Sequence, residues 1–189
     1  MKIILVRHTK PNIDSSLCYG QSDLELDSGF EKVDLLTVLA KFSTMDDTQL
    51  SKIGKIYSSP LKRCKTLAGK VADSLQLSQV ECDNRLMERN YGLWELKRWT
   101  EDIYNSDFGK KWFDNYLELA PPEGESFFDL CRRADSFIRE LKTDLRGECV
   151  IIVTHSGFIS AFLVAAKMCR VEQLKNLKIE YGEVIEVEI

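Results

Sequence analysis

The sequence predicts an α/β fold, a single-domain three-layer α/β/α sandwich in which a mostly parallel sheet carries helices on both faces. Two continuous apolar runs, Ile-Ile-Leu-Val at residues 3–6 and Val-Ile-Ile-Val at residues 150–153, are typical of parallel strands that are buried on both faces. Helical patterns alternate with strand patterns along the chain, which favours helices on both sides of one sheet. No linker or repeat divides the 189 residues, so residues 1–189 are expected to form one domain.

The other elements follow from weaker patterns. Strands are expected at residues 55–58 and 80–82, and the alternation at residues 183–189 is typical of an edge strand. Ser59 followed by Pro60 is typical of an N-cap and a first helical position, and Ser126 or Glu125 is expected to cap a later helix. Helices are expected at residues 30–45, 60–75, 101–119, 126–145 and 157–169.

Composition and charge argue against several partners. The net charge is −4 and the pI is near 5.4, whereas nucleic acids and anionic membranes attract basic surfaces. The apolar runs at residues 3–6 and 158–166 are too short for a signal peptide or for a bilayer span of roughly 20 residues. We therefore expect a soluble protein that binds neither nucleic acid nor membrane.

The six cysteines are scattered and include no Cys-x-x-Cys pair. A zinc site or a disulfide framework would need closer or paired spacing. Several of the cysteines lie inside apolar periodic segments, so we expect reduced cysteines that serve as small core residues in a cytoplasmic protein.

The chain has two histidines, and they occupy matching places. His8 and His155 each follow one of the two strongest strand candidates. If these strands are parallel, both imidazoles emerge at the carboxyl edge of the sheet, where ligands bind in open α/β folds. A single histidine there would be unremarkable, but the pair predicts a site. Because histidine titrates near pH 6.5, a neutral nucleophile and a charged stabiliser can coexist at pH 7.

Two arginines are expected at the same edge. Arg7 precedes His8, and Arg63 lies close to the start of the helix that follows the predicted strand at residues 55–58. The planar guanidinium suits bidentate contact with phosphate oxygens. A helix that opens after His155 adds free backbone N–H groups, with Gly157 allowing close approach. The simplest occupant of such a pocket is phosphate.

Three motifs in this order resemble the histidine phosphatase superfamily, also called phosphoglycerate-mutase-like. They are Arg-His-Thr at residues 7–9, Ser-Ser-Pro-Leu-Lys-Arg at residues 58–63 and Val-Thr-His-Ser-Gly at residues 153–157. The resemblance spans nearly the whole chain. It implies a phosphatase in which His8 accepts the phosphoryl group, while Arg7, Arg63 and His155 hold its oxygens.

A fourth segment supplies an acid. Leu-Met-Glu-Arg-Asn-Tyr-Gly-Leu-Trp-Glu at residues 86–95 is similar to a family segment whose first glutamate is the proton donor. The resemblance gives this role to Glu88, with Glu95 as the competing carboxylate. Glu88 would protonate the leaving oxygen and then activate water against phosphohistidine. The implied chemistry needs no metal ion or other cofactor.

Within the superfamily, residues 18–23 and 121–126 look most like the α-ribazole phosphatase branch, which acts late in cobalamin biosynthesis. The short chain agrees with this branch, and Gln21 is a tentative substrate contact. The substrate expected is a small-molecule phosphate monoester. Two alternatives stay open: a broad-specificity sugar-phosphate phosphatase or phosphoglycerate mutase, and a non-catalytic phosphate-binding regulatory module. Apolar residues in the last strand are compatible with a homodimer.

The chain departs from the family pattern at four places. Thr9, Ser156 and Leu96 stand where glycines are usual, and Asp14 stands where many members place a phosphate-binding asparagine. A carboxylate would repel phosphate, so Asp14 is given no role. The aromatic residues of the segment 94–116 form either a lid that stacks on a flat base or a core-facing helix.

Overall fold

The computed structural model describes residues 1–30, 34–144 and 149–189, and within these ranges five strands form one sheet in the order β3-β2-β4-β1-β5. Four strands are parallel and the edge strand β5 is antiparallel to β1, which confirms the mostly parallel sheet. The strands are β1 (Lys2–Arg7), β2 (Ile53–Ser58), β3 (Val80–Cys82), β4 (Cys149–Thr154) and β5 (Val184–Glu188).

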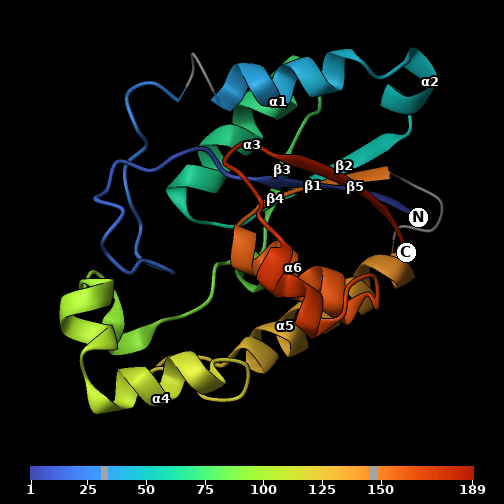
Figure 1. Cartoon of the computed structure of the whole chain (residues 1–189). Helices are drawn as coiled ribbons and strands as arrows, with labels where there is room; N and C mark the ends of the chain where they lie inside the picture. Colours follow the sequence, from blue (N-terminus) through green and yellow to red (C-terminus); the bar gives the residue numbers. More distant parts are fainter. Residues whose placement is uncertain (31–33, 145–148) are drawn as a thin grey trace.

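Side chains along β1 point alternately to the two faces of the sheet, and helices cover both faces. Ile3 and Leu5 pack with helices α5 and α6, whereas Ile4 and Val6 pack with α1 and α3. Figure 1 shows the two layers on either side of the strands. The expected three-layer sandwich is confirmed. The covering helices are α1 (Asp34–Ser43), α3 (Lys62–Ser74), α5 (Phe127–Asp144) and α6 (Ser156–Ala165).

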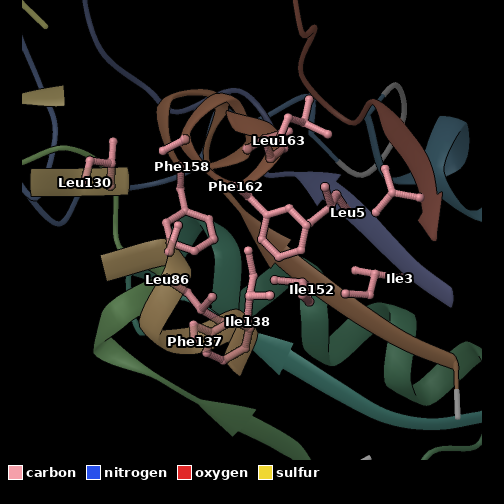
Figure 2. Close-up of a cluster of buried hydrophobic side chains, with 14 of the residues drawn as sticks. Ile3, Leu5, Leu86, Leu130, Phe137, Ile138, Ile152, Phe158, Phe162 and Leu163 are labelled. Carbon is pink, nitrogen blue, oxygen red and sulfur yellow. The ribbon is translucent and has the colours of Figure 1, made fainter. Parts of the chain in front are cut away.

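The larger core lies between the sheet and the pair α5 and α6. Figure 2 shows the rings of Phe158 and Phe162, both on α6, beside the strand residues Leu5 and Ile152. All four side chains are fully buried. This core fixes α6 against β4, so the start of α6 is held at the carboxyl edge of the sheet.

A third hydrophobic cluster joins the loop after β1 to the segment between η1 and α5, which stands away from the sheet in Figure 1. It is built from Cys18, Trp94, Ile103 and Trp112. The short elements of the chain are α2 (Asp47–Leu50), η1 (Asn84–Leu86), η2 (Gly92–Trp94), the π-helical η3 (Trp99–Tyr104), α4 (Asp107–Asn115) and η4 (Val171–Asn176).

The expected start of α3 is wrong by two residues. The helix begins at Lys62, and Leu61 rather than Ser59 is its N-cap. The backbone N–H of Lys62 donates to the carboxylate of Asp23 at 2.7 Å, so a distant residue supplies the cap. The hydroxyl of Ser59 lies 2.9 Å from Nε2 of His155, with which it forms a hydrogen bond.

The single helix expected at residues 101–119 is two elements, η3 and α4. Ser106 separates them because its hydroxyl accepts a hydrogen bond from Gly109 N at 2.9 Å and caps α4. A β-carbon at Gly109 would lie 1.8 Å from the carbonyl oxygen of Ile103. The two helices therefore meet too closely for any other residue at this position.

The remaining helix boundaries differ at their ends. Helix α1 is described from Asp34. Residues 31–33 of its expected range, and Leu145 at the expected end of α5, lie outside the described residues. Ser126 caps α5 by accepting from Asp129 N at 3.1 Å, as expected. Helix α6 ends at Ala165 rather than Cys169, and Lys167 has a φ of +61°.

The cysteines are only partly core residues. All six are free thiols, of which Cys18, Cys64 and Cys149 are buried while Cys82 is exposed. Among the described helices, none combines the length and the apolar character needed to cross a bilayer.

Candidate active site

The parallel pairing of β1 and β4 brings the two histidines together. Arg7 lies opposite Thr154 in the register, and His8 N donates to Thr154 O at 2.8 Å. The two imidazole rings meet edge to face, with their centroids 4.9 Å apart. Both side chains are buried. The predicted meeting of His8 and His155 at the carboxyl edge is therefore present.

The His8 ring is oriented by the next residue. Its Nδ1 lies 2.6 Å from the carbonyl oxygen of Thr9. Because a carbonyl can only accept, Nδ1 carries the proton and Nε2 keeps its lone pair. A free Nε2 is what a nucleophilic histidine requires.

The His155 ring contacts two residues of the segment 59–64. Its Nε2 is 2.9 Å from Ser59 Oγ and 3.3 Å from Cys64 Sγ, and both partners are buried. Ser59 lies in the motif at residues 58–63, but its place before Pro60 predicted a helix cap and not a contact with His155. No sequence pattern predicted that Cys64 contacts His155.

The two arginines lie on aromatic rings. The guanidinium of Arg7 sits 3.8 Å from the ring centroid of Tyr181 and donates to the carbonyl oxygen of Ile179. The ring of Tyr181 is 5.6 Å from that of His8, and its hydroxyl is 2.8 Å from that of Tyr19. Neither tyrosine was predicted as a site residue.

Arg63 is fully buried. It donates to the carbonyl oxygens of Gly20 and Ser22 and lies 5.5 Å from the ring centroid of Tyr19. Helix α3 therefore places Arg63 at the carboxyl edge, as predicted, and its bonds to the loop that follows β1 were not predicted.

Donors around His8 lack partners. Among the described residues, four buried side-chain nitrogen or oxygen atoms have no hydrogen bond, and three of them are Arg7 Nε, Arg63 Nε and Thr9 Oγ1. Buried polar groups are normally paired. Two unpaired guanidinium nitrogens beside two imidazoles make this region suited to an oxyanion.

Charge and burial keep both imidazoles neutral in this structure. Burial, and then the positive charge of Arg63, hold the pKa of His8 well below its usual value. The same causes, with His8 as a further one, lower the pKa of His155. The expected protonated His155 belongs to the pocket with phosphate bound and stays a prediction, because an anion beside the ring would raise its pKa again.

Glu88 lies between the sheet edge and the start of α6. Its Oε2 accepts from Gly157 N at 3.1 Å and its Oε1 from Arg89 N at 2.9 Å. A β-carbon at Gly157 would lie 2.2 Å from Glu88 Oε1. Gly157 therefore matters because it leaves room for this carboxylate.

Glu95 has a different position and partners. Its carboxylate accepts from the backbone N–H groups of Gly20, Gln21 and Ser22 and from the Ser22 hydroxyl. These hydrogen bonds outweigh burial and lower the pKa of Glu95. Since this carboxylate is committed to a loop, the geometry favours Glu88 as the acid.

Gln21 and Asp14 each have a partner other than His8. Gln21 Nε2 donates to the carbonyl oxygen of Glu88 at 3.0 Å, so it holds the backbone of the acid, and its contact with substrate stays a prediction. Asp14 is exposed, accepts from Ser16 N at 2.9 Å and lies 3.6 Å from Arg98. The assumption that Asp14 does not hold phosphate agrees with this arrangement.

Arg133 holds the segment that carries Glu88. From α5 its guanidinium donates to the carbonyl oxygens of Arg85, Met87 and Glu88, and it pairs with Glu125. Nothing in the sequence distinguished this arginine from its exposed neighbours, because its partners are backbone atoms 45 to 48 residues away.

Two adjoining cavities border Arg7, His8 and Glu88, while Arg63 and His155 line neither of the two. The smaller, of about 230 Å³, is lined by Arg7, His8, Ser15, Leu17, Tyr19, Glu88, Tyr91, Trp99, Ser156 and Tyr181. The larger, of about 420 Å³, is lined by Glu88, Arg89, Tyr91, Trp112, Phe113, Tyr116, Phe127, Leu130, Ser156, Gly157, Ser160 and Leu174. The aromatic segment is thus both a small core and a cavity wall.

Comparison with known proteins defines the class. The model of the histidine phosphatase superfamily (branch 1) matches residues 3–189, and the chain belongs to this superfamily. The fold and the family together define a phosphatase.

Individual relatives are distant. The chain is 26% identical over 160 residues to phosphoserine phosphatase 1 of Hydrogenobacter thermophilus, covering 82% of this chain and 71% of that protein. It is 25% identical over 187 residues to the adenosylcobalamin/alpha-ribazole phosphatase of Escherichia coli, covering 96% and 87%. The structure of Bacillus stearothermophilus YhfR superposes with a TM-score of 0.83 at 24% identity, covering 100% of this chain and 91% of that one, which shows the shared fold.

Proposed function

We propose that the protein hydrolyses a phosphate monoester through a phosphohistidine on His8. One observation carries this proposal. The His8 ring presents an unprotonated Nε2 because Thr9 holds Nδ1, and Arg7, Arg63 and His155 surround it. In phosphoryl transfer the protein mainly positions groups and balances charge.

In the first half-reaction His8 Nε2 attacks phosphorus in line with the ester oxygen. Arg7, Arg63 and His155 neutralise the equatorial oxygens, and the phosphate dianion stabilises the proton on His155. Protonated Glu88 gives its proton to the departing oxygen. The P–O bond to the leaving group breaks as the P–N bond to His8 forms.

In the second half-reaction the Glu88 carboxylate takes a proton from water as the water oxygen attacks phosphorus. The P–N bond breaks, inorganic phosphate forms, and Glu88 is again protonated. Gly157 N and Arg89 N hold the carboxylate in place through both steps. No step requires a metal ion.

For the substrate we propose α-ribazole 5'-phosphate, in cobalamin biosynthesis. The residue patterns at 18–23 and 121–126 support this choice. So does the similarity to the Escherichia coli adenosylcobalamin/alpha-ribazole phosphatase, which covers more of both chains than the similarity to phosphoserine phosphatase 1 does. That second similarity favours one alternative, a phosphatase of other phosphate monoesters.

A substrate panel tests the proposal. The purified protein is given α-ribazole 5'-phosphate, phosphoserine, glucose 6-phosphate and 3-phosphoglycerate, with and without a chelator, and released phosphate is measured. We expect hydrolysis in the chelator and the highest kcat/KM for α-ribazole 5'-phosphate. Preference for a sugar phosphate contradicts the substrate, and isomerised phosphoglycerate indicates a mutase. Binding of phosphate without hydrolysis of any ester indicates a regulatory module.

Two further expectations remain proposals. A cytoplasmic location fits the six free thiols. A homodimer would pair the exposed edge of β5, which hydrogen-bonds to β1 on one side only.

A further inference from the structure

The two cavities at the site meet at Glu88. They share Glu88, Tyr91 and Ser156 in their linings. The smaller cavity contains His8 and Arg7 and is the place for the phosphoryl group. Because Glu88 borders both cavities, the ester oxygen that it protonates lies at their junction. The rest of the leaving group then continues into the larger cavity.

The larger cavity has one aromatic wall. It is formed by Tyr91, Trp112, Phe113, Tyr116 and Phe127. The rings of Trp112 and Phe113 are 5.0 Å apart and nearly perpendicular. Such walls favour flat, apolar ligands because ring faces and edges pack well against one another. The volume of about 420 Å³ is within the range of small-molecule sites, roughly 300–1,000 Å³.

The first part of α6 also lines this cavity. Ser156, Gly157 and Ser160 line the cavity there. The hydroxyl of Ser160 donates to the carbonyl oxygen of Ser156 at 2.9 Å. The part of the lining that α6 supplies is therefore made of small, uncharged residues, which take up little of the cavity.

Charge in the larger cavity is unfavourable for an anionic leaving group. Among its lining residues the charged ones are Glu88 and Arg89. Arg89 Nε donates to Glu125 O at 2.9 Å, and Nη2 donates to the carbonyl oxygens of Tyr116 and Leu119. Bidentate pairing with a carboxylate needs two neighbouring guanidinium nitrogens that are free to donate. In Arg89 both possible pairs, Nε with Nη2 and Nη1 with Nη2, include Nη2, which already donates to backbone oxygens.

The next groove offers no better partner. It adjoins the cavity at Phe113 and Tyr116 and is lined by Lys175 together with Asp114 and Glu172. A carboxylate placed there would meet two acids and one lysine. Phosphoserine and phosphoglycerate therefore lack a matched cation for their carboxylates along this path.

Building on the proposed function, we propose that the larger cavity is the leaving-group subsite and that it selects a flat, uncharged aromatic group, such as a nucleoside base, over a carboxylated one. The aromatic wall stacks on the base, and the small residues of α6 leave room for it. The selectivity comes from the cavity between α4, α5 and α6, not from the groups that hold phosphate.

A cavity-filling substitution tests this subsite. In Ser160→Leu a larger side chain enters the cavity from α6, at a position that does not line the smaller cavity. We expect kcat/KM for α-ribazole 5'-phosphate to fall at least tenfold more than kcat/KM for glycerol 2-phosphate, whose leaving group is small. The matched control is Ser136→Leu on the exposed side of α5, which we expect to change neither value.

A binding measurement separates this inference from the proposed function. The dephosphorylated nucleoside, α-ribazole, is titrated into the protein, and the fluorescence of Trp112 and its neighbours Trp94 and Trp99 reports binding. We expect saturable binding that Ser160→Leu weakens at least tenfold. Equal losses on both esters, wild-type preference for phosphoserine, or nucleoside binding unaffected by Ser160→Leu would overturn the subsite. If no ester is hydrolysed, the proposed function fails, and the nucleoside titration still decides the subsite.

Discussion

The imidazole rings of His8 and His155 lie edge to face with their centroids 4.9 Å apart, in a pocket that also contains Arg63. Two imidazolium ions at this distance, beside a guanidinium, would repel one another strongly in a buried site. The pocket therefore keeps both rings neutral until an anion enters. This relationship determines how the stability of the protein depends on pH.

We predict that the protein without ligand loses stability as the pH falls below about 6.5. The pKa values of His8 and His155 are lowered in the folded state, so in this window the unfolded chain binds protons that the folded chain does not. Stability then rises with pH and falls with acid. Each histidine contributes about 0.7 kcal/mol per pH unit at pH 6.5, and this slope approaches about 1.4 kcal/mol per pH unit near pH 5.5.

Denaturant unfolding between pH 5.5 and 7.5 measures this slope, and His8→Asn is the comparison. We expect its change in unfolding free energy across this whole window to be smaller by about 1.4 kcal/mol, with most of the difference below pH 6.5. Vanadate, which resembles phosphate, should flatten the slope of the wild type because it stabilises a proton on His155. An identical slope in His8→Asn would show that His8 titrates normally.

We predict that replacing Glu88 lowers the rate of hydrolysis, whereas replacing Glu95 lowers the stability of the fold. In Glu88→Gln, single-turnover hydrolysis of an alkyl phosphate should fall about 10²- to 10⁴-fold, as expected when a general acid is lost. Transfer from p-nitrophenyl phosphate should fall much less in the same turnover, because its leaving group needs no proton. Equal losses on both esters would contradict the acid role.

Glu95→Gln should instead lower stability. Its carboxylate accepts from three successive backbone N–H groups, and weakening this clamp should cost about 1–3 kcal/mol in denaturant unfolding. The ratio of activities on the alkyl and p-nitrophenyl esters should stay as in the wild type. A ratio shifted as in Glu88→Gln would make Glu95 the acid.

We predict that Gly157→Ala reduces activity with little loss of stability. The new methyl group would lie 2.2 Å from Glu88 Oε1, so the flexible carboxylate must move, while the backbone N–H that holds it is retained. A displacement of about 1 Å can cost about 10²-fold in rate. Gly69→Ala on α3 is the control, because nothing lies within 4 Å of its β-carbon; a comparable rate loss there would contradict the explanation.

We predict that Arg133 acts through Glu88. Arg133→Lys cannot reproduce a fork that reaches the carbonyl oxygens of Arg85, Met87 and Glu88. Its kcat on an alkyl phosphate should fall at least tenfold, with a smaller effect on p-nitrophenyl phosphate and on KM. Arg132→Lys, whose side chain is 73% exposed, should behave as the wild type. A uniform loss on both esters would indicate a merely structural role.

The sequence predicted the parts of the site that depend on strand ends and short motifs. His8 and His155 follow strands with strong local patterns, Arg63 lies in the short motif at residues 58–63, and the sheet brings all three to one edge. Ser59, Tyr181 and Arg133 were missed, because their roles come from contacts across the fold that no local pattern encodes.

The departures from the family's glycines differ in the backbone strain that they cause. Thr9 is buried but has no left-handed backbone conformation, so glycine is not required there. Leu96 has a φ of +63°, where glycine would avoid a strain of about 1 kcal/mol. The sequence could identify both departures, but only the backbone distinguishes the tolerated one from the strained one.

Trapping of the phosphoenzyme tests the central claim most directly. The protein is mixed with a labile phosphate ester, quenched at alkaline pH, where phosphohistidine persists, and the phosphorylated residue is located by mass spectrometry. We predict one phosphoryl group on His8 in the wild type, increased occupancy in Glu88→Gln, and none in His8→Asn. Phosphate on another residue, or hydrolysis that persists in His8→Asn, would contradict the account.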